Sequence, residues 1–138
     1  MLIRLIYASR ARNLGPMDVK DILESSRRNN AAAGVTGALC ISNGIFLQCL
    51  EGDRMVVNTL YHRILKDSRH QDPAILDFQD IAYRDFGTWN MGLVSAVEDN
   101  RALFLKYASG PQFDPYQMRP ETLRAFFAEL IGNTRWLS

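Results

Sequence analysis

The chain has 138 residues, of which 47% are hydrophobic, and its 16 basic and 15 acidic side chains leave a formal net charge of +1. This length predicts one domain with a real core, the apolar share excludes an intrinsically disordered chain, and the balanced charge gives no reason to expect nucleic-acid binding. There is no apolar run of membrane-spanning length and no signal peptide, and Cys40 and Cys49 lack a metal-type spacing, so we expect reduced, buried thiols in a cytoplasmic protein.

The first elements read as a strand followed by a helix. Residues 2–8 are almost wholly apolar, which is typical of a central strand that is covered on both faces. A helix is then predicted to start with Asp18 as its N-cap and Asp21 in a capping-box-like position, and to run to about Asn30. At its end, Asn29 and Asn30 either cap the C-terminus or contact a ligand, and the residues alone leave both roles open.

A β-hairpin follows, and it contains the least expected side chain of the sequence. Residues 35–42 alternate as a strand and lead into Asn43-Gly44, the strongest short signal for a two-residue hairpin loop. That loop pairs Leu39 with Gln48, so Gln48 lies on an aliphatic, buried face. A primary amide that is buried without partners costs about 1–3 kcal/mol, and Gln48 therefore needs a hydrogen-bond partner inside the fold.

The second half completes a β-α-β-β-α-β-β order. Asp53 is the predicted N-cap of a helix that runs to about residue 66, and strands are predicted at residues 74–83 and 91–97. This order is typical of an α+β, ferredoxin-like fold with a five-stranded mixed sheet and both helices on one face. Its first and third strands are central neighbours, so Tyr7 lies beside Gln48 and can donate to it. The residues alone do not say whether this pair serves a ligand or only satisfies itself.

Five segments, taken together, resemble the BLUF family, the flavin-binding blue-light sensors of bacteria, and in particular its short stand-alone members. They occur in order with family-like spacing, and the resemblance implies a flavin-binding domain over residues 1–97. Residues 98–138 fall outside it and are expected to form a C-terminal helical extension that packs on the other sheet face. The segments are LIYAS at 5–9, NNAAAGVTG at 29–37, NGIFLQCLEGD at 43–53, KDSRH at 66–70 and FGTWNM at 86–91.

The resemblance implies a non-covalent FAD, with FMN possible, held between the two helices. Tyr7 and Gln48 would form the photochemical pair: Tyr7 gives an electron and a proton to the light-excited flavin, and the hydrogen bonding of Gln48 rearranges reversibly. Trp89 and Met91 would carry the signal along the last strand, and either could lie next to Gln48; ordinary packing is the alternative for both. The residues expected to bind the cofactor are Ile22, Asn29, Asn30, Phe46, Gln48, Arg63, Ile64, Asp67, Arg69 and His70.

Three functions fit the sequence: a light-sensing switch, a flavoenzyme, and a cofactor-free interaction module of ferredoxin-like fold. We expect no enzyme, because we find no nicotinamide fingerprint and no nucleophile–base pair. Output is then expected through a separate response protein or through self-association as a homo-oligomer, without nucleic acid or membrane. A visible spectrum of the purified protein, before and after blue light, separates the three.

Overall fold

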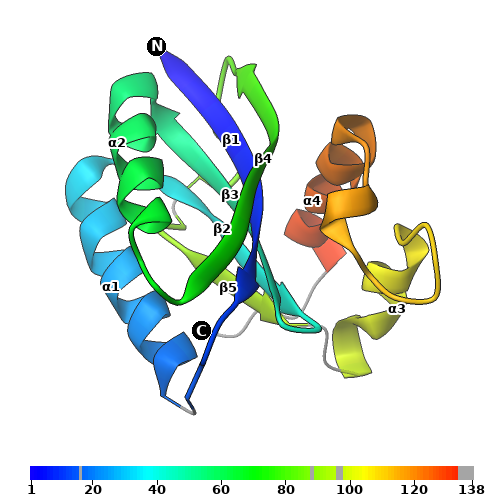
Figure 1. The fold of residues 1–138 in the computed structure, drawn as a ribbon. Helices are drawn as coiled ribbons and strands as arrows, with labels where there is room; N and C mark the ends of the chain where they lie inside the picture. Colours follow the sequence, from blue (N-terminus) through cyan, green and yellow to red (C-terminus); the bar gives the residue numbers. More distant parts are fainter. Residues whose placement is uncertain (16, 88, 96–97, 134–138) are drawn as a thin grey trace.

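A five-stranded sheet lies between two layers of helices (Figure 1). The computed structural model describes residues 1–138 except 16, 88, 96–97 and 134–138. The strands are β1 (Leu2–Ala11), β2 (Thr36–Ser42), β3 (Ile45–Asp53), β4 (His70–Asp80) and β5 (Gly92–Ser95). The helices are α1 (Asp18–Ala33), α2 (Arg54–Leu65), α3 (Glu98–Lys106) and α4 (Pro120–Asn133), with a 3-10 turn at Pro115–Gln117.

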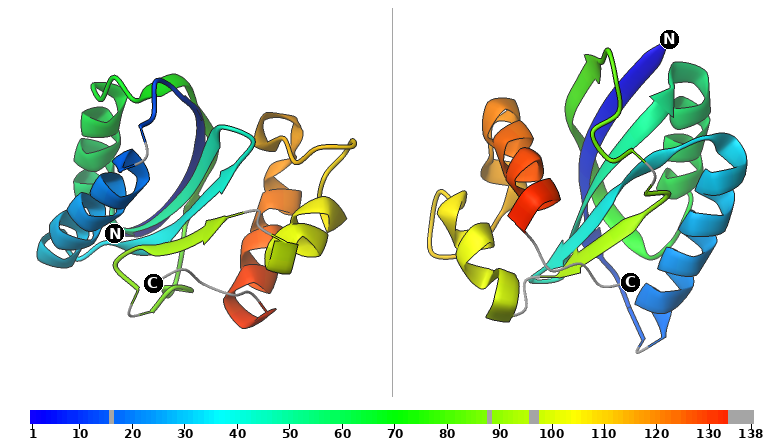
Figure 2. Two further views of the ribbon diagram at one scale, coloured as in Figure 1. Left: turned by 90° about the horizontal axis from the view of Figure 1, so that it is seen from below. Right: turned by 180° about the vertical axis from the view of Figure 1, so that it is seen from behind.

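The sheet has the order β4-β1-β3-β2-β5, antiparallel except for the parallel β2–β5 pair. Helices α1 and α2 cover one face, and α3 and α4 lie against the other (Figures 1 and 2). This is the α+β, ferredoxin-like fold that the element order predicts, with a mixed sheet and C-terminal helices on the second face. The predicted last strand began at Met91 and ended at residue 97; β5 begins one residue later, and residues 96–97 lie outside the described part.

The hairpin forms with the predicted register, because its loop residues adopt the backbone conformation that such a turn demands. Asn43 and Gly44 both have positive φ, 52° and 72°, which is typical of a type I′ turn. The loop sets Leu39 opposite Gln48, and the β1–β3 pairing sets Tyr7 opposite Gln48. Both cross-strand predictions are therefore confirmed, and the buried amide lies at the centre of the sheet.

Helix α1 departs from the prediction at both ends. Its N-cap is Met17 rather than Asp18, whose carboxylate instead accepts from the backbone N–H of Gly15 at 2.5 Å. The helix continues through three alanines, which are strong helix formers, and ends at Gly34 in the left-handed conformation, φ 70°. Capping of the C-terminus by the two asparagines was therefore the wrong alternative. Helix α2 begins as predicted, with the Asp53 carboxylate accepting from the N–H of Met55 at 3.2 Å.

Strand β4 begins four residues earlier than predicted, because at the sheet edge it can extend through Pro73, and it ends three residues earlier. An edge strand tolerates Pro73, whose missing N–H would interrupt a central strand. In the described residues, none of the helices combines the length and the apolar character that crossing a bilayer requires.

Each layer of helices encloses its own hydrophobic core. The core under α3 and α4 contains Phe104, Phe126 and Leu130, packed on the sheet residues Cys40 and Cys49. Both cysteines are free thiols, as predicted, with at most 1% of their surface exposed. Burial raises the pKa of each thiol well above its ordinary value, so both stay protonated and unreactive. The other core, under α1 and α2, surrounds the cavity described next.

Candidate functional site

A cavity of about 210 Å³ opens between α1 and α2, above the middle of the sheet. Strands β1–β3 form its floor, the two helices its walls, and the connection from α2 to β4 its mouth. A second cavity of about 300 Å³ shares four of the same lining residues, so the two form one groove between the helices. The first is lined by Tyr7, Ile22, Ser25, Ser26, Asn29, Asn30, Leu39, Gln48, Leu60, Arg63, Ile64, Asp67, Arg69 and His70.

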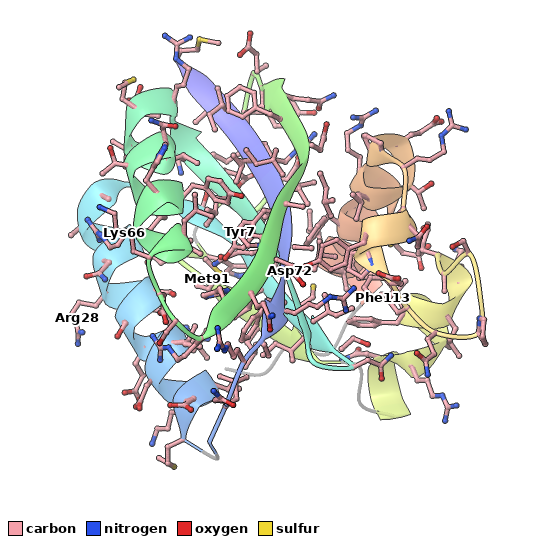
Figure 3. All side chains as sticks on the ribbon, viewed as in Figure 1. Tyr7, Arg28, Lys66, Asp72, Met91 and Phe113 are labelled. Atoms are coloured by element: carbon pink, nitrogen blue, oxygen red, sulfur yellow. The ribbon has the colours of Figure 1, made fainter. Side chains whose placement is uncertain are left out.

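On the floor of the cavity, a short hydrogen-bond chain joins three buried side chains. The Tyr7 hydroxyl donates to Oε1 of Gln48, and Nε2 of Gln48 donates to the sulfur of Met91 at 3.3 Å. These residues are only 1%, 5% and 2% exposed, and Figure 3 shows Tyr7 and Met91 on the face that α1 and α2 cover. The partners that a buried Gln48 requires are therefore Tyr7 and Met91. Because an amide nitrogen carries two hydrogens, Gln48 keeps one N–H for a ligand in the cavity.

Tyr7 is held as a neutral phenol. Burial raises its pKa far above the ordinary value near 10, and the nearby Tyr61 and Asp67 raise it further. The ring of Tyr61 lies 5.3 Å from the ring of Tyr7, centroid to centroid. A phenol in this setting cannot release its proton to water, so the acceptor within reach is the oxygen of Gln48.

The walls of the cavity are apolar, with polar groups at one edge. Ile22 of α1 and Ile64 of α2 line it from opposite helices. Asn30 is 2% exposed, and its Nδ2 donates to the backbone carbonyl of Asn90 at 2.8 Å. Its neighbour Asn29 is exposed at the rim. Apolar walls with a few oriented polar groups are typical of a small-molecule site.

The mouth of the cavity carries charged and polar groups. Arg69 binds the carboxylate of Asp67 with two nitrogens, Nη2 at 2.7 Å and Nε at 3.0 Å, and this pairing lowers the pKa of Asp67. His70 contacts Oγ of Ser9 through Nδ1 at 2.6 Å, and burial lowers the pKa of its imidazole below 6.5. Arg63 of α2 also reaches this opening. The mouth therefore suits an anionic, hydrogen-bonding group.

Ten of the thirteen predicted site residues line this cavity, and Phe46, Trp89 and Met91 do not. Phe46 is fully buried, and the ring of His70 lies 4.9 Å from its own, so that the imidazole covers it. Trp89 packs in the other core, 5.8 Å from the ring of Phe86, whereas Met91 meets Gln48. Trp89 and Met91 both precede β5 and do not belong to it.

Four lining residues were not predicted. Leu39 could have been found, because it is the hairpin partner of Gln48. Ser25 and Ser26 lie three and four residues after Ile22 on the same helix face, but serine carries no signal of a binding role. Leu60 lies four residues before Ile64 and so shares its face of α2.

The cavity fits a planar, partly polar heterocycle such as a flavin. Two isoleucines oppose each other across it, amide groups offer donors and acceptors at the floor and edge, and the mouth can receive a phosphate-bearing tail. Among the residues that the structure describes, no group of three or more His, Cys, Asp or Glu could hold a metal ion.

Comparison with known proteins assigns this arrangement to a family. Residues 2–92 match the family model BLUF, described as sensors of blue-light using FAD. A photoactivated adenylate cyclase subunit beta of Euglena gracilis is 36% identical over 105 residues, which are 75% of this chain and 12% of the cyclase subunit. The blue light- and temperature-regulated antirepressor BluF of Escherichia coli K12 is 33% identical over 94 residues, 67% of this chain and 23% of that protein.

A solved structure extends the similarity to nearly the whole chain. The photo-activated state of BlsA superposes with a TM-score of 0.87 at 31% identity, covering 98% of this chain and 99% of that one. The curated relatives above are much longer, and this chain spans less than a quarter of their length. The similarity to the cyclase subunit is therefore no evidence that this chain has cyclase activity.

Proposed function

The chain belongs to the BLUF family of blue-light sensors that use FAD, and on that premise we propose that Tyr7 and Gln48 are its light-responsive pair. The observation that carries the proposal is the hydrogen-bond chain from Tyr7 through Gln48 to Met91 on the floor of a cavity of suitable shape.

We propose that FAD, or FMN in its place, binds between α1 and α2. Ile22 and Ile64 would flank its ring, Asn30 and Gln48 would bind its polar edge, Asn29 would lie at the rim, and Phe46 would support the site from beneath His70. Arg63, Asp67, Arg69 and His70 would surround the phosphate-bearing tail, where cations favour bound phosphate. When bound, the flavin supplies a group that absorbs blue light and becomes a strong oxidant.

The protein's own part in the switch follows from its buried hydrogen bonds. Tyr7 is an oxidisable phenol that would give its electron to the excited flavin, while its proton moves along the existing bond to Oε1 of Gln48 and the amide nitrogen gives up a proton toward the flavin in exchange. A carboxamide that gains a proton on oxygen and gives one up from nitrogen alters its donor and acceptor positions, so its hydrogen bonds to Tyr7 and to the sulfur of Met91 would rearrange. No covalent bond is made, and the dark arrangement returns thermally.

Residues 1–97 would form the light-sensing unit. Residues 98–138 would form a helical layer on the other sheet face, which would respond to the rearranged hydrogen bonds at the cavity and pass the signal on. The E. coli relative is named as an antirepressor, which supports output through a separate response protein. Self-association as a homo-oligomer is the other route for output that we propose. We propose a cytoplasmic location, with no membrane or nucleic acid as partner.

A visible spectrum tests the proposed function. The purified protein should take up FAD, show flavin absorption bands, and shift them slightly to the red under blue light, with full return in the dark. A protein that stays colourless after incubation with FAD, or one that binds it without a reversible shift, contradicts the proposal.

A further inference from the structure

The chain between β4 and β5 crosses from one layer of helices to the other. We call residues 84–87 and 89–91 the crossing segment. At its first end, Phe86 packs against Phe127 of α4, with ring centroids 6.1 Å apart, and at its last end Met91 meets Gln48 at the cavity floor. Trp89 lies between them and packs in the core under the C-terminal helices. This segment is thus a direct physical link between the two faces of the sheet.

The first end of the crossing segment is held by a fully buried carboxylate. Glu51 of β3 has no exposed surface; its Oε2 accepts the backbone N–H of Asp85 at 2.7 Å, and its Oε1 accepts that of Phe86 at 3.0 Å. The hydroxyl of Thr36, opposite Glu51 on β2, donates to the same Oε1 at 2.9 Å. Nη1 of Arg84 donates to the Thr36 hydroxyl and to the backbone carbonyl of Glu51, at 3.0 and 3.1 Å.

The last end is held by separate contacts, mostly from α1. Nε of Arg27 donates to the carbonyl of Met91 at 3.0 Å, and Asn30 donates to that of Asn90. The N–H of Gly37 donates to the carbonyl of Trp89 at 3.0 Å. Of these groups Asn30 lines the cavity, so this end lies next to the part of the molecule that would respond to light, whereas Glu51 lies on the far face.

Stability alone is a poor explanation for a carboxylate at this place. Burying an ionised group is unfavourable, and apolar residues of similar size often replace buried ionic groups without loss of stability. The geometry here serves another purpose, because both oxygens bind consecutive backbone N–H groups and so fix the position of the main chain itself. Charge-assisted bonds of this kind are roughly twice as strong as neutral ones.

We propose that Glu51 is a positioning residue that fixes the first end of the crossing segment, so that a displacement of Met91 is passed to Trp89 and α4. The proposal rests on the proposed function. With residues 85 and 86 anchored, a change in the Gln48–Met91 contact displaces residues 89–91, where the indole of Trp89 packs under the C-terminal helices. Without the anchor, the residues before Phe86 would move as well, and the displacement of Met91 would not reach α4.

The test separates the light reaction from its transmission. In the FAD-loaded full chain, Glu51→Gln keeps the size of the side chain but replaces one N–H acceptor by a donor. We expect it to retain the red shift of the parent protein, and to lose the light-induced difference in amide hydrogen exchange over residues 120–133. The matched control is Asp85→Asn, which removes the ion pair with Arg4 at 3.0 Å but leaves the backbone N–H on Glu51; it should keep both responses.

Each other outcome has a defined meaning. A parent protein without a red shift contradicts the proposed function, whereas a parent that shifts but shows no exchange difference in α4 overturns the inference alone. The inference is also overturned if Glu51→Gln transmits as well as the parent, or if Asp85→Asn loses transmission equally. Should Glu51→Gln not fold, Thr36→Val removes one bond from the carboxylate at nearly constant volume, and an undiminished exchange difference in that variant overturns the inference.

Discussion

The sharpest test of the site is Tyr7→Phe, because it deletes one hydroxyl and leaves the ring. The deletion removes the donor to Oε1 of Gln48, a side chain that is 5% exposed. The ring still fills its place, so no cavity forms, and the expected loss is that of a buried acceptor without a partner, about 1–3 kcal/mol of unfolding free energy. In a chain of this length that lowers the midpoint of thermal unfolding by roughly 3–10 °C.

The effect on the light response should be complete rather than graded. Phenylalanine offers neither the oxidisable phenol nor the proton, so FAD-loaded Tyr7→Phe should keep its flavin bands and show no red shift. Difference spectra before and after blue light, together with a thermal melt of the same sample, measure both effects.

The neighbouring Tyr61 supplies the control. Its ring contacts that of Tyr7 and it is 8% exposed, but the hydroxyl that donates to Gln48 is that of Tyr7. Tyr61→Phe should therefore keep the red shift and lose little stability. A full red shift in Tyr7→Phe, or equal losses in the two variants, would refute the reasoning.

Three further outcomes follow from the geometry. Arg69→Ala leaves the Asp67 carboxylate unpaired at the mouth and should weaken FAD binding about tenfold, or 1.4 kcal/mol, in a fluorescence titration. The control is Arg28→Ala on the outer side of α1 (Figure 3), which should leave FAD binding unchanged. Equal effects of the two variants would contradict the assignment of the mouth to the phosphate-bearing tail. Asp53→Ala removes the N-cap of α2 and should lower the urea concentration at the midpoint of unfolding, and an unchanged midpoint would contradict the cap. Because burial lowers the pKa of His70, the unfolded chain binds its proton first as pH falls below about 6.5, and stability falls with it. His70→Gln should make this decline shallower, and an identical pH profile of urea unfolding would show that His70 does not contribute to it.

Local chemistry explains what the sequence could predict about the fold. Asn43-Gly44 requires a tight turn whatever the rest of the chain does, and the turn fixes which residues face Gln48. Tyr7 came within reach of Gln48 through topology, since the element order makes β1 and β3 neighbours. From these two steps the floor of the cavity could be placed before any coordinates were known.

The remaining features depend on contacts between distant segments. A strand through residues 91–97 suggested that Trp89 and Met91 belong to one element, but β5 begins only at Gly92, and the preceding chain turns so that the two side chains enter opposite cores. Nothing in the sequence singles out Glu51, which is one acidic residue near the end of β3. Its partners are the backbone N–H groups of residues more than thirty positions later in the chain. Because every residue except proline has such a group, the sequence does not show which of them bind Glu51.

The two thiols beneath the C-terminal helices give the protein a built-in chemical reporter. Cys40 and Cys49 are sealed between the sheet and α4, so an alkylating reagent reaches them only when that layer lifts or the chain unfolds. The rate of alkylation therefore reports how readily the layer of C-terminal helices separates from the sheet, and no label has to be introduced. Comparing that rate under illumination and in darkness measures how far this layer detaches when the cavity on the opposite side changes state.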